Sequence, residues 1–263
     1  MRLDYGTILC PEPITLSVGT IKNPKLKEIA KLGFDKFGYF EFLLKMNPEV
    51  FYTKVKGDDG KNYWDALTDE EKEQAILYDV IINDDKLVNV YIEIFNFFFV
   101  EPVVFRDGFF ILLKEDINDE TEINADNIRG VIAKDNMSQV LGLLQQICCI
   151  YEDNEDVNDL KFKNDLARKM YERMLKASRE EKSSKKSDIN LTLPNIISSI
   201  SNKHPSINPI NVWDLTIFQL LDSFNRMQVN ALYDIDSTRV SVWGDEKKTF
   251  NASLWYKNEY DKR

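Results

Sequence analysis

The sequence predicts a predominantly helical α+β fold, with an N-terminal α+β domain that contains short hairpins and a C-terminal helical region. Apolar residues recur at helical spacing over several long stretches. The segments between the first of these stretches are rich in β-branched residues, Pro and Gly, which is typical of short strands joined by turns. The chain has 263 residues, 43% of them hydrophobic, and is long enough to bury one large core or two small ones.

The first elements are a hairpin and a pair of helices. Residues 7–26 mix β-branched residues with three prolines and Gly19, which predicts one or two short strands joined by a turn. From Leu26 to Met46, two sets of apolar residues fall at helical spacing on either side of Gly33. We therefore expect two helices with a break at this glycine.

The middle of the N-terminal part predicts three more helices and a second hairpin. Thr68 stands three residues before Glu71 in a capping-box arrangement, so a helix is expected from there to about Asp79. Residues 87–98 form an apolar helix that ends before Pro102. The pair Asp107-Gly108 between two β-type runs predicts a hairpin with a two-residue turn. Residues 136–150 predict a further helix with its apolar side inward.

Composition divides the chain into three parts: an α+β domain over 1–152, a connecting region over 153–189, and a helical region over 190–263. The connecting region opens with the acidic run "YEDNEDVND". Residues 161–186 then contain ten Lys or Arg and four Asp or Glu. An apolar stripe in their first half predicts an amphipathic helix. The Ser- and Lys-rich sequence that follows predicts a flexible linker near 180–189.

The C-terminal region predicts a short helix and a long one. Pro194 suits a first helical turn, and Pro205 and Pro209 separate the two helices. In the long helix one face is apolar, and Asp222, Asn225 and Gln228 are expected on the opposite face; the apolar members are Ile217, Leu220, Leu221, Phe224, Met227, Ala231, Leu232 and Ile235. Beyond it, residues 239–243 predict a short strand, Gly244 a turn, and Trp255 with Tyr256 an aromatic contact.

Charge and composition disfavour several classes of protein. The net charge of -10 and the pI of about 4.8 oppose binding to a phosphate backbone. Neither an export signal nor an apolar run long enough to span a bilayer is visible, so we expect a soluble protein. Cys10, Cys148 and Cys149 have no metal-ligand spacing and are expected to be buried thiols in a reducing compartment.

No motif specifies a chemistry. His204 lies in a proline-flanked loop and is expected to cap that loop or to be exposed. The acidic run at 153–159 lacks the turn glycine and the bidentate glutamate of a calcium loop. Asp58 and Asp59 make a weak magnesium candidate and are better explained as part of a surface turn. Because phosphate-binding, dinucleotide-binding and metal-binding motifs are absent from the sequence, we expect no cofactor, no metal, no catalytic residue and no enzymatic activity. Carboxylates dispersed along the chain remain an alternative.

The amphipathic helices are then the best candidates for function. Their apolar faces could pack internally, or one of them could lie against a partner protein. Methionines on these faces suit a surface that adapts to its partner. The predicted partner-binding residues are Phe162, Leu166, Met170, Met174, Trp213, Phe218, Leu221, Phe224, Arg226 and Met227.

The acidic run, the charged helix and the sequence "INPINVWDLTIFQLLDSFNRMQ" together resemble tail assembly proteins of long-tailed bacteriophages and prophages. These are the chaperone-type proteins that accompany the tape measure protein. The resemblance covers residues 150–235 and rests on the sequence pattern in which Trp213 precedes a predicted helix with Phe218, Leu221 and Arg226. It implies a non-enzymatic assembly factor in the host cytoplasm that shields tape measure or tail tube components. The net charge separately disfavours nucleic acid as a partner, and the missing apolar run predicts no membrane partner. The alternatives are a structural or connector protein of the phage tail and a metal-dependent enzyme with dispersed carboxylates.

Overall fold

A computed structural model describes residues 2–114, 126–150, 189–246, 248–258 and 260. It is predominantly helical with one two-stranded and one three-stranded antiparallel sheet, which confirms the predicted fold class. The N-terminal part contains α1 (Tyr5–Leu9), α2 (Leu26–Leu32), α3 (Phe34–Leu44), α4 (Pro48–Val50), the π-helix η1 (Phe51–Val55), α5 (Gly57–Ala66), α6 (Asp69–Gln74), α7 (Leu77–Ile82), α8 (Asp85–Phe98) and α9 (Met137–Ile147). The C-terminal part contains α11 (Leu193–Lys203), α12 (Ile217–Trp243) and the 3₁₀ turns η2 (Ile189–Leu191), η3 (Val212–Asp214) and η4 (Leu254–Tyr256).

The two sheets are both small. In the first, β1 (Ile14–Thr15) pairs with β2 (Thr20–Ile21), as the Pro- and Gly-rich opening predicted. In the second, the order is β3 (Val103–Arg106), β4 (Phe109–Leu113) and β5 (Ile128–Ile132). Asp107 and Gly108 join β3 to β4 with φ angles of 52° and 82°, which confirms the predicted two-residue turn. The third strand, β5, was not predicted.

The two sheets touch at Gly130 in the middle of β5. A methyl group at this position would lie 2.0 Å from the carbonyl oxygen of Val18, in the turn between β1 and β2. The guanidinium of Arg129 donates to the backbone oxygens of Leu16 and Ser17 at 3.1 and 3.2 Å. Glycine therefore permits a backbone-to-backbone contact that any larger residue would prevent.

The core of the N-terminal part forms around α8. The carboxylate of Asp84 accepts the backbone N–H groups of Lys86 and Leu87 and so starts the helix. Tyr91 and Phe95 are fully buried, and the Tyr91 hydroxyl donates to the backbone oxygen of Leu43 at 2.9 Å. The Phe95 ring meets the Phe110 ring of β4 with centroids 5.1 Å apart. Helix α8 thus links α3 to the three-stranded sheet.

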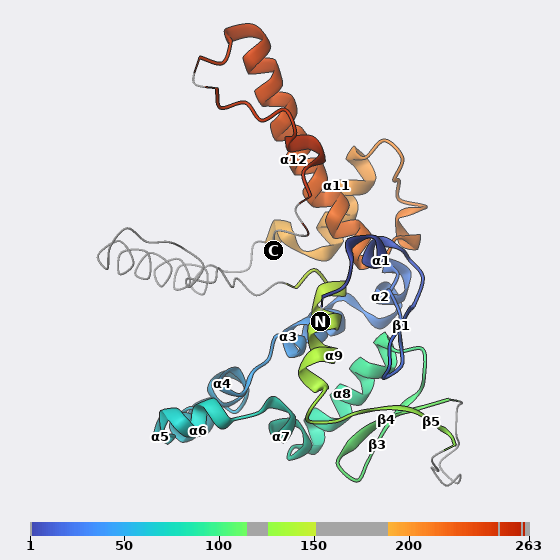
Figure 1. Cartoon of the computed structure of the whole chain (residues 1–263), viewed down its shortest axis with the longest axis vertical. Helices are drawn as coiled ribbons and strands as arrows, with labels where there is room; N and C mark the ends of the chain where they lie inside the picture. Colours follow the sequence, from blue (N-terminus) through green and yellow to red (C-terminus); the bar gives the residue numbers. More distant parts are fainter. Residues whose placement is uncertain (1, 115–125, 151–188, 247, 259, 261–263) are drawn as a thin grey trace.

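The C-terminal helices pack directly against the N-terminal part. The backbone N–H of Leu26 donates to Leu215 at 2.9 Å, and that of Ile217 donates to Pro24 at 3.0 Å. One cluster of buried apolar side chains extends from Leu3 to Tyr260. The base of α12 therefore belongs to the main core, while its distal half projects away from the body (Figure 1).

Most predicted helices are confirmed. The break at Gly33 separates α2 from α3, Pro194 lies in the first turn of α11, and Thr68 with Glu71 forms the capping box of α6. The predicted amphipathic helix and linker between residues 153 and 189 lie almost entirely outside the described residues, as does the acidic run that precedes them.

Other predictions were wrong. The helix from Thr68 ends at Gln74, and α7 is a separate helix because Ala75 and Ile76 have extended backbone angles. Residues 239–243 continue α12 instead of forming a strand. Cys10 is exposed and Cys149 is only partly buried, although Cys148 is buried as expected.

Candidate protein-binding groove

A groove opens between α11 and α12 on the outer side of the C-terminal part. It has a volume of about 400 Å³. From α11 it is lined by Ser199, Ile200 and Lys203, and from α12 by Phe224, Met227, Gln228, Ala231 and Leu232. Most of this lining is aliphatic, aromatic or thioether, and Leu232 is 61% exposed. The groove has the chemistry that receives the apolar face of a helix.

The turn between the two helices explains why they lie side by side. The imidazole of His204 accepts the backbone N–H groups of Ser206 and Ile207 through Nδ1, each at 3.2 Å, so it caps the loop as predicted. The indole N–H of Trp213 donates to the backbone oxygen of Pro209 at 3.0 Å. These bonds fold the proline-rich segment into a tight connection, and α12 then starts beside α11.

Thr216 fixes the start of α12. Its hydroxyl accepts the backbone N–H of Gln219 at 3.1 Å, and the Gln219 side chain accepts the backbone N–H of Thr216 at 3.0 Å. This is a complete capping box, and Thr216 is fully buried. The direction of the long helix is therefore set where it leaves the core.

The face of α12 that carries Arg226 is covered by the chain itself. The guanidinium of Arg226 binds the Asp222 carboxylate at 3.0 Å and the Tyr5 hydroxyl at 2.8 Å. The Tyr5 hydroxyl in turn donates to Asp222 at 3.0 Å, and partial burial raises the pKa of Tyr5. Leu254 and Trp255, in the segment after α12, lie over the same face. The hollow left there, about 30 Å³, has room only for a water molecule or two.

The structure distributes the predicted partner-binding residues over several environments. Phe224 and Met227 line the groove. Phe218 is 2% exposed and belongs to the core, and Leu221 packs against it. Trp213 lies in a separate hollow of about 250 Å³ with Phe34 and Pro194. Arg226 makes the internal contacts just described. Phe162, Leu166, Met170 and Met174 lie outside the described residues.

Three groove residues come from α11 and were not among those predicted. Ser199, Ile200 and Lys203 fall on one side of that helix at spacings of one and three residues. The apolar periodicity of α11 was visible in the sequence, but its pairing with α12 was not. Gln228 was expected on the polar side of α12 and lies instead at the groove.

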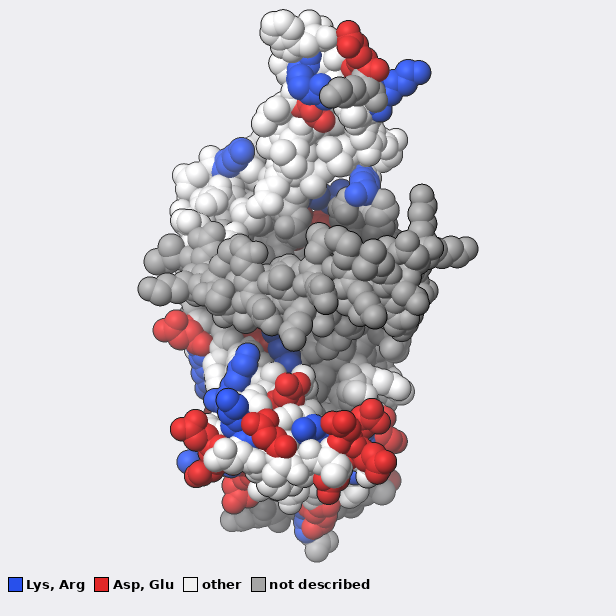
Figure 2. Space-filling model, turned by 90° about the vertical axis from the view of Figure 1, so that its left-hand side faces the viewer, with Lys and Arg blue, Asp and Glu red and all other residues white. Residues whose placement is uncertain are grey.

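Acidic side chains gather on the part of the molecule that carries α4 to α6. Figure 2 shows many Asp and Glu side chains on the lower part of this face, whereas the upper tip has Lys, Arg, Asp and Glu side chains close together. Helices α5 and α6 place five acidic residues in their first turns: Asp58, Asp59, Asp69, Glu70 and Glu71. The lining of the groove is mainly apolar and includes one charged residue, Lys203.

The described residues offer little for metal or membrane chemistry. Within them, no group of three or more His, Cys, Asp or Glu side chains is arranged to hold a metal ion. Asp58 and Asp59 lie in the first turn of α5. None of the helices in the described ranges combines the length and apolar character needed to cross a bilayer.

The fold and the groove define a class: a predominantly helical α+β protein that presents an apolar groove between two helices. Residues 182–260 of the chain are similar to a known family, because they match the family model described as YomV second domain. The match covers α11, α12 and the segment that follows, and spans less than a third of the chain. It associates the chain with a phage domain family and carries no information on tail assembly. No curated protein and no solved structure matched the chain.

Proposed function

We propose that this chain is a non-enzymatic phage assembly protein that binds unassembled tail components, such as the tape measure protein, in the host cytoplasm. The observation that carries the proposal is the open apolar groove between α11 and α12. This groove lies inside the segment that matches a phage-associated domain family. The similarity of residues 150–235 to tail assembly chaperones supports the same function.

The mechanism is shielding of an apolar helix. The tape measure protein is long, and its apolar helical faces have no tail tube around them before assembly. A groove lined by Phe224, Met227 and Leu232 covers such a face and removes it from water. The Met227 side chain adapts to different apolar partners because its thioether is flexible and polarizable. Tail tube subunits then displace the chain as the tail is built.

Co-expression of the full chain with the tape measure protein tests this function. The wild type is expected to raise the soluble yield of that protein and to purify with it. Ser199→Arg places a large cation at the mouth of the groove and should abolish the complex. Ser198→Arg is a matched control, since Ser198 is also exposed and lies on the side of α11 that faces Trp213.

Two results would count against the proposal. One is the absence of a complex with the wild type. The other is an equal loss of binding in both variants, because the groove would then not be the contact surface. Mass spectrometry of purified phage particles separates the rival function, since an assembly factor is absent from mature particles and a structural tail protein is present in them.

A further inference from the structure

The distal half of α12 leaves apolar side chains exposed beyond the groove. The groove ends at Leu232, yet Ile235 is 68% exposed and Val242 is 64% exposed. The segment after α12 folds back on another side of the helix, where the Phe250 ring meets Tyr233 with centroids 5.7 Å apart. The segment that returns to the core therefore leaves Ile235 and Val242 uncovered.

Ile235 and Val242 belong to a stripe with heptad spacing, in which Gln228 and Thr238 are also exposed and Ala231 is half-buried. Gln228, Ala231, Ile235, Thr238 and Val242 are separated alternately by three and four residues. This is the spacing of a and d positions in a coiled coil, with Gln228, Ile235 and Val242 at a, and Ala231 and Thr238 at d. Tyr233, which contacts the returning segment, falls at f, the position farthest from the seam.

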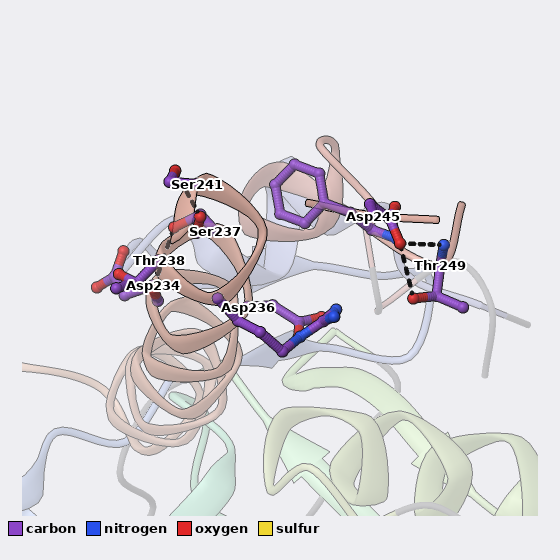
Figure 3. A network of polar contacts seen from close by, with 9 residues as sticks. Asp234, Asp236, Ser237, Thr238, Ser241, Asp245 and Thr249 are labelled. Carbon is purple, nitrogen blue, oxygen red and sulfur yellow. Dashed lines mark hydrogen bonds and ion pairs between the residues drawn. The ribbon is translucent and has the colours of Figure 1, made fainter. Parts of the chain in front are cut away.

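The local sequence is poorly suited to a helix that stands alone in water. Three hydroxyl groups here bond backward to helix carbonyls: Ser237 and Thr238 to Asp234 at 3.0 and 2.8 Å, and Ser241 to Ser237 at 2.8 Å (Figure 3). Such bonds slightly weaken a helix, and Ser, Thr and Val are weaker helix formers than Ala or Leu. Most helical stability in proteins comes from packing of an apolar face. This end of α12 lacks that packing in a single chain.

The flanking positions indicate which partner fits. In a parallel pair, a g residue faces the e residue five positions later in the other helix. Within one chain, Arg239 binds Asp236 of its own helix at 3.0 Å, and both side chains are partly exposed. In the pair, Asp234 at g of the other helix would also face Arg239 at e, and Met227 at g would face Leu232 at e. An antiparallel pair places g opposite g and e opposite e, so Asp234 would not meet Arg239. The complementary charges therefore favour a second copy of the same helix in parallel register.

We propose that a second copy of this chain covers the distal stripe of α12, forming a parallel, in-register, two-stranded coiled coil across residues 228–242. Each chain contributes Ile235 and Val242 to the seam, and Asp234 of each chain binds Arg239 of the other. The distal half of α12 projects from the body, which leaves this stripe accessible (Figure 1). The first two layers of the seam, Gln228 and Ala231, also line the groove, whereas Ile235, Thr238 and Val242 lie beyond its end. The substitutions that test the dimer are therefore placed beyond the groove.

The seam is short, so the dimer is expected to depend on concentration. Specific, stable interfaces bury about 1,200–2,000 Å² of surface in total, and a seam of five layers buries less surface than that. Sedimentation of the purified chain alone should show the mass rising from 30.7 kDa toward twice that value as concentration increases. Ile235→Asp should stay monomeric at every concentration and keep its fold, since the side chain is exposed.

Cysteine cross-linking tests the register. Cys10 is exposed and is first replaced by Ser. In this background, Ile235→Cys should form a disulfide-linked dimer on mild oxidation, because equivalent a positions meet in a parallel pair. Asn230→Cys, at an exposed c position of the same helix, is the matched control and should not form a disulfide-linked dimer. Cross-linking of both variants alike, or of neither, would overturn the proposed seam.

Charge reversal tests the ionic contact. Asp234→Arg should lose the dimer, and adding Arg239→Asp should restore it, with helical content followed by circular dichroism. Failure of the double variant to recover would overturn the parallel arrangement. Ile235→Asp leaves every groove residue unchanged and should still bind the tail partner, so loss of tail-partner binding and loss of the dimer are distinguishable. A chain that stays monomeric at every concentration refutes the dimer without affecting the proposed function.

Discussion

Replacing Gly130 by alanine should destabilise the protein, whereas replacing Gly142 by alanine should stabilise it. Gly130 lies in β5, where a methyl group would meet the backbone of Val18 with its carbon 2.0 Å from the oxygen and 2.7 Å from the carbonyl carbon. Backbone atoms cannot rotate away as a flexible side chain does. Gly130→Ala therefore must push the β1–β2 turn off the three-stranded sheet.

The expected cost follows from this geometry. Overpacking of a well-packed site typically costs about 1–3 kcal/mol, and a contact with backbone belongs at the upper end of that range. The displacement also weakens the bonds from Arg129 to Leu16 and Ser17. We expect Gly130→Ala to lower the free energy of unfolding by about 3 kcal/mol.

Gly142 provides the matched control within α9. A methyl group there meets no atom within 4 Å, and the residue is in a helix interior. Alanine is favoured over glycine in a helix by about 1 kcal/mol, so Gly142→Ala should stabilise the protein by that amount. Urea denaturation followed by circular dichroism measures both changes as shifts of the midpoint. A neutral Gly130→Ala would refute this account of how the two sheets meet, and a destabilising Gly142→Ala would refute the space assigned to a methyl group in α9.

Two further substitutions test the start of α12 and the burial of a carboxylate. Thr216→Ala removes the buried capping hydroxyl and should cost about 1–2 kcal/mol in urea denaturation, while Thr216→Ser should retain most of the stability. Burial raises the pKa of Glu41 above its ordinary value, so its ionised form is disfavoured in the folded protein. The contribution of this carboxyl to stability is therefore present below its unfolded pKa and lost as the pH rises through its folded pKa. Glu41→Gln should then raise the melting temperature near pH 7, with a gain that shrinks as the pH falls toward 4; a gain that is constant with pH would contradict the argument.

Helices with one apolar face were predictable from this sequence. In helix α8, core residues such as Tyr91 and Phe95 recur at helical spacing between more polar residues. This period is visible in the sequence because one side of the helix is buried. Local chemistry also identified the Asp107-Gly108 turn and the capping box at Thr68. These features depend on neighbours close in the chain, which a sequence displays directly.

Elements that depend on distant contacts were not predictable. Residues 239–243 include two valines, which favour a strand, but they extend a helix that already begins at Ile217 and ends before Gly244, whose φ is 76°. The short helix α1 and strand β5 are too brief to show a period. Neither element has a sequence pattern strong enough to predict it.

The candidate site was only partly predictable for a related reason. Helix α12 has three occupied sides at its base: the core, α11 and the segment that carries Trp255. A single periodic stripe cannot say which apolar residue faces which neighbour. Phe218 and Met227 therefore looked alike in the sequence, although one is in the core and the other lines the groove.

The hydroxyl of Tyr260 donates to the backbone oxygen of Leu3 at 2.8 Å, and its ring packs against Tyr5 and Phe218. During synthesis, Leu3 and Tyr5 leave the ribosome more than 250 residues before Tyr260 does. Their apolar surfaces must stay without these partners until Tyr260 has emerged. The nascent chain is consequently exposed to aggregation for longer than its helical content would suggest, and a fusion that restrains residues near 260 would prevent this closure.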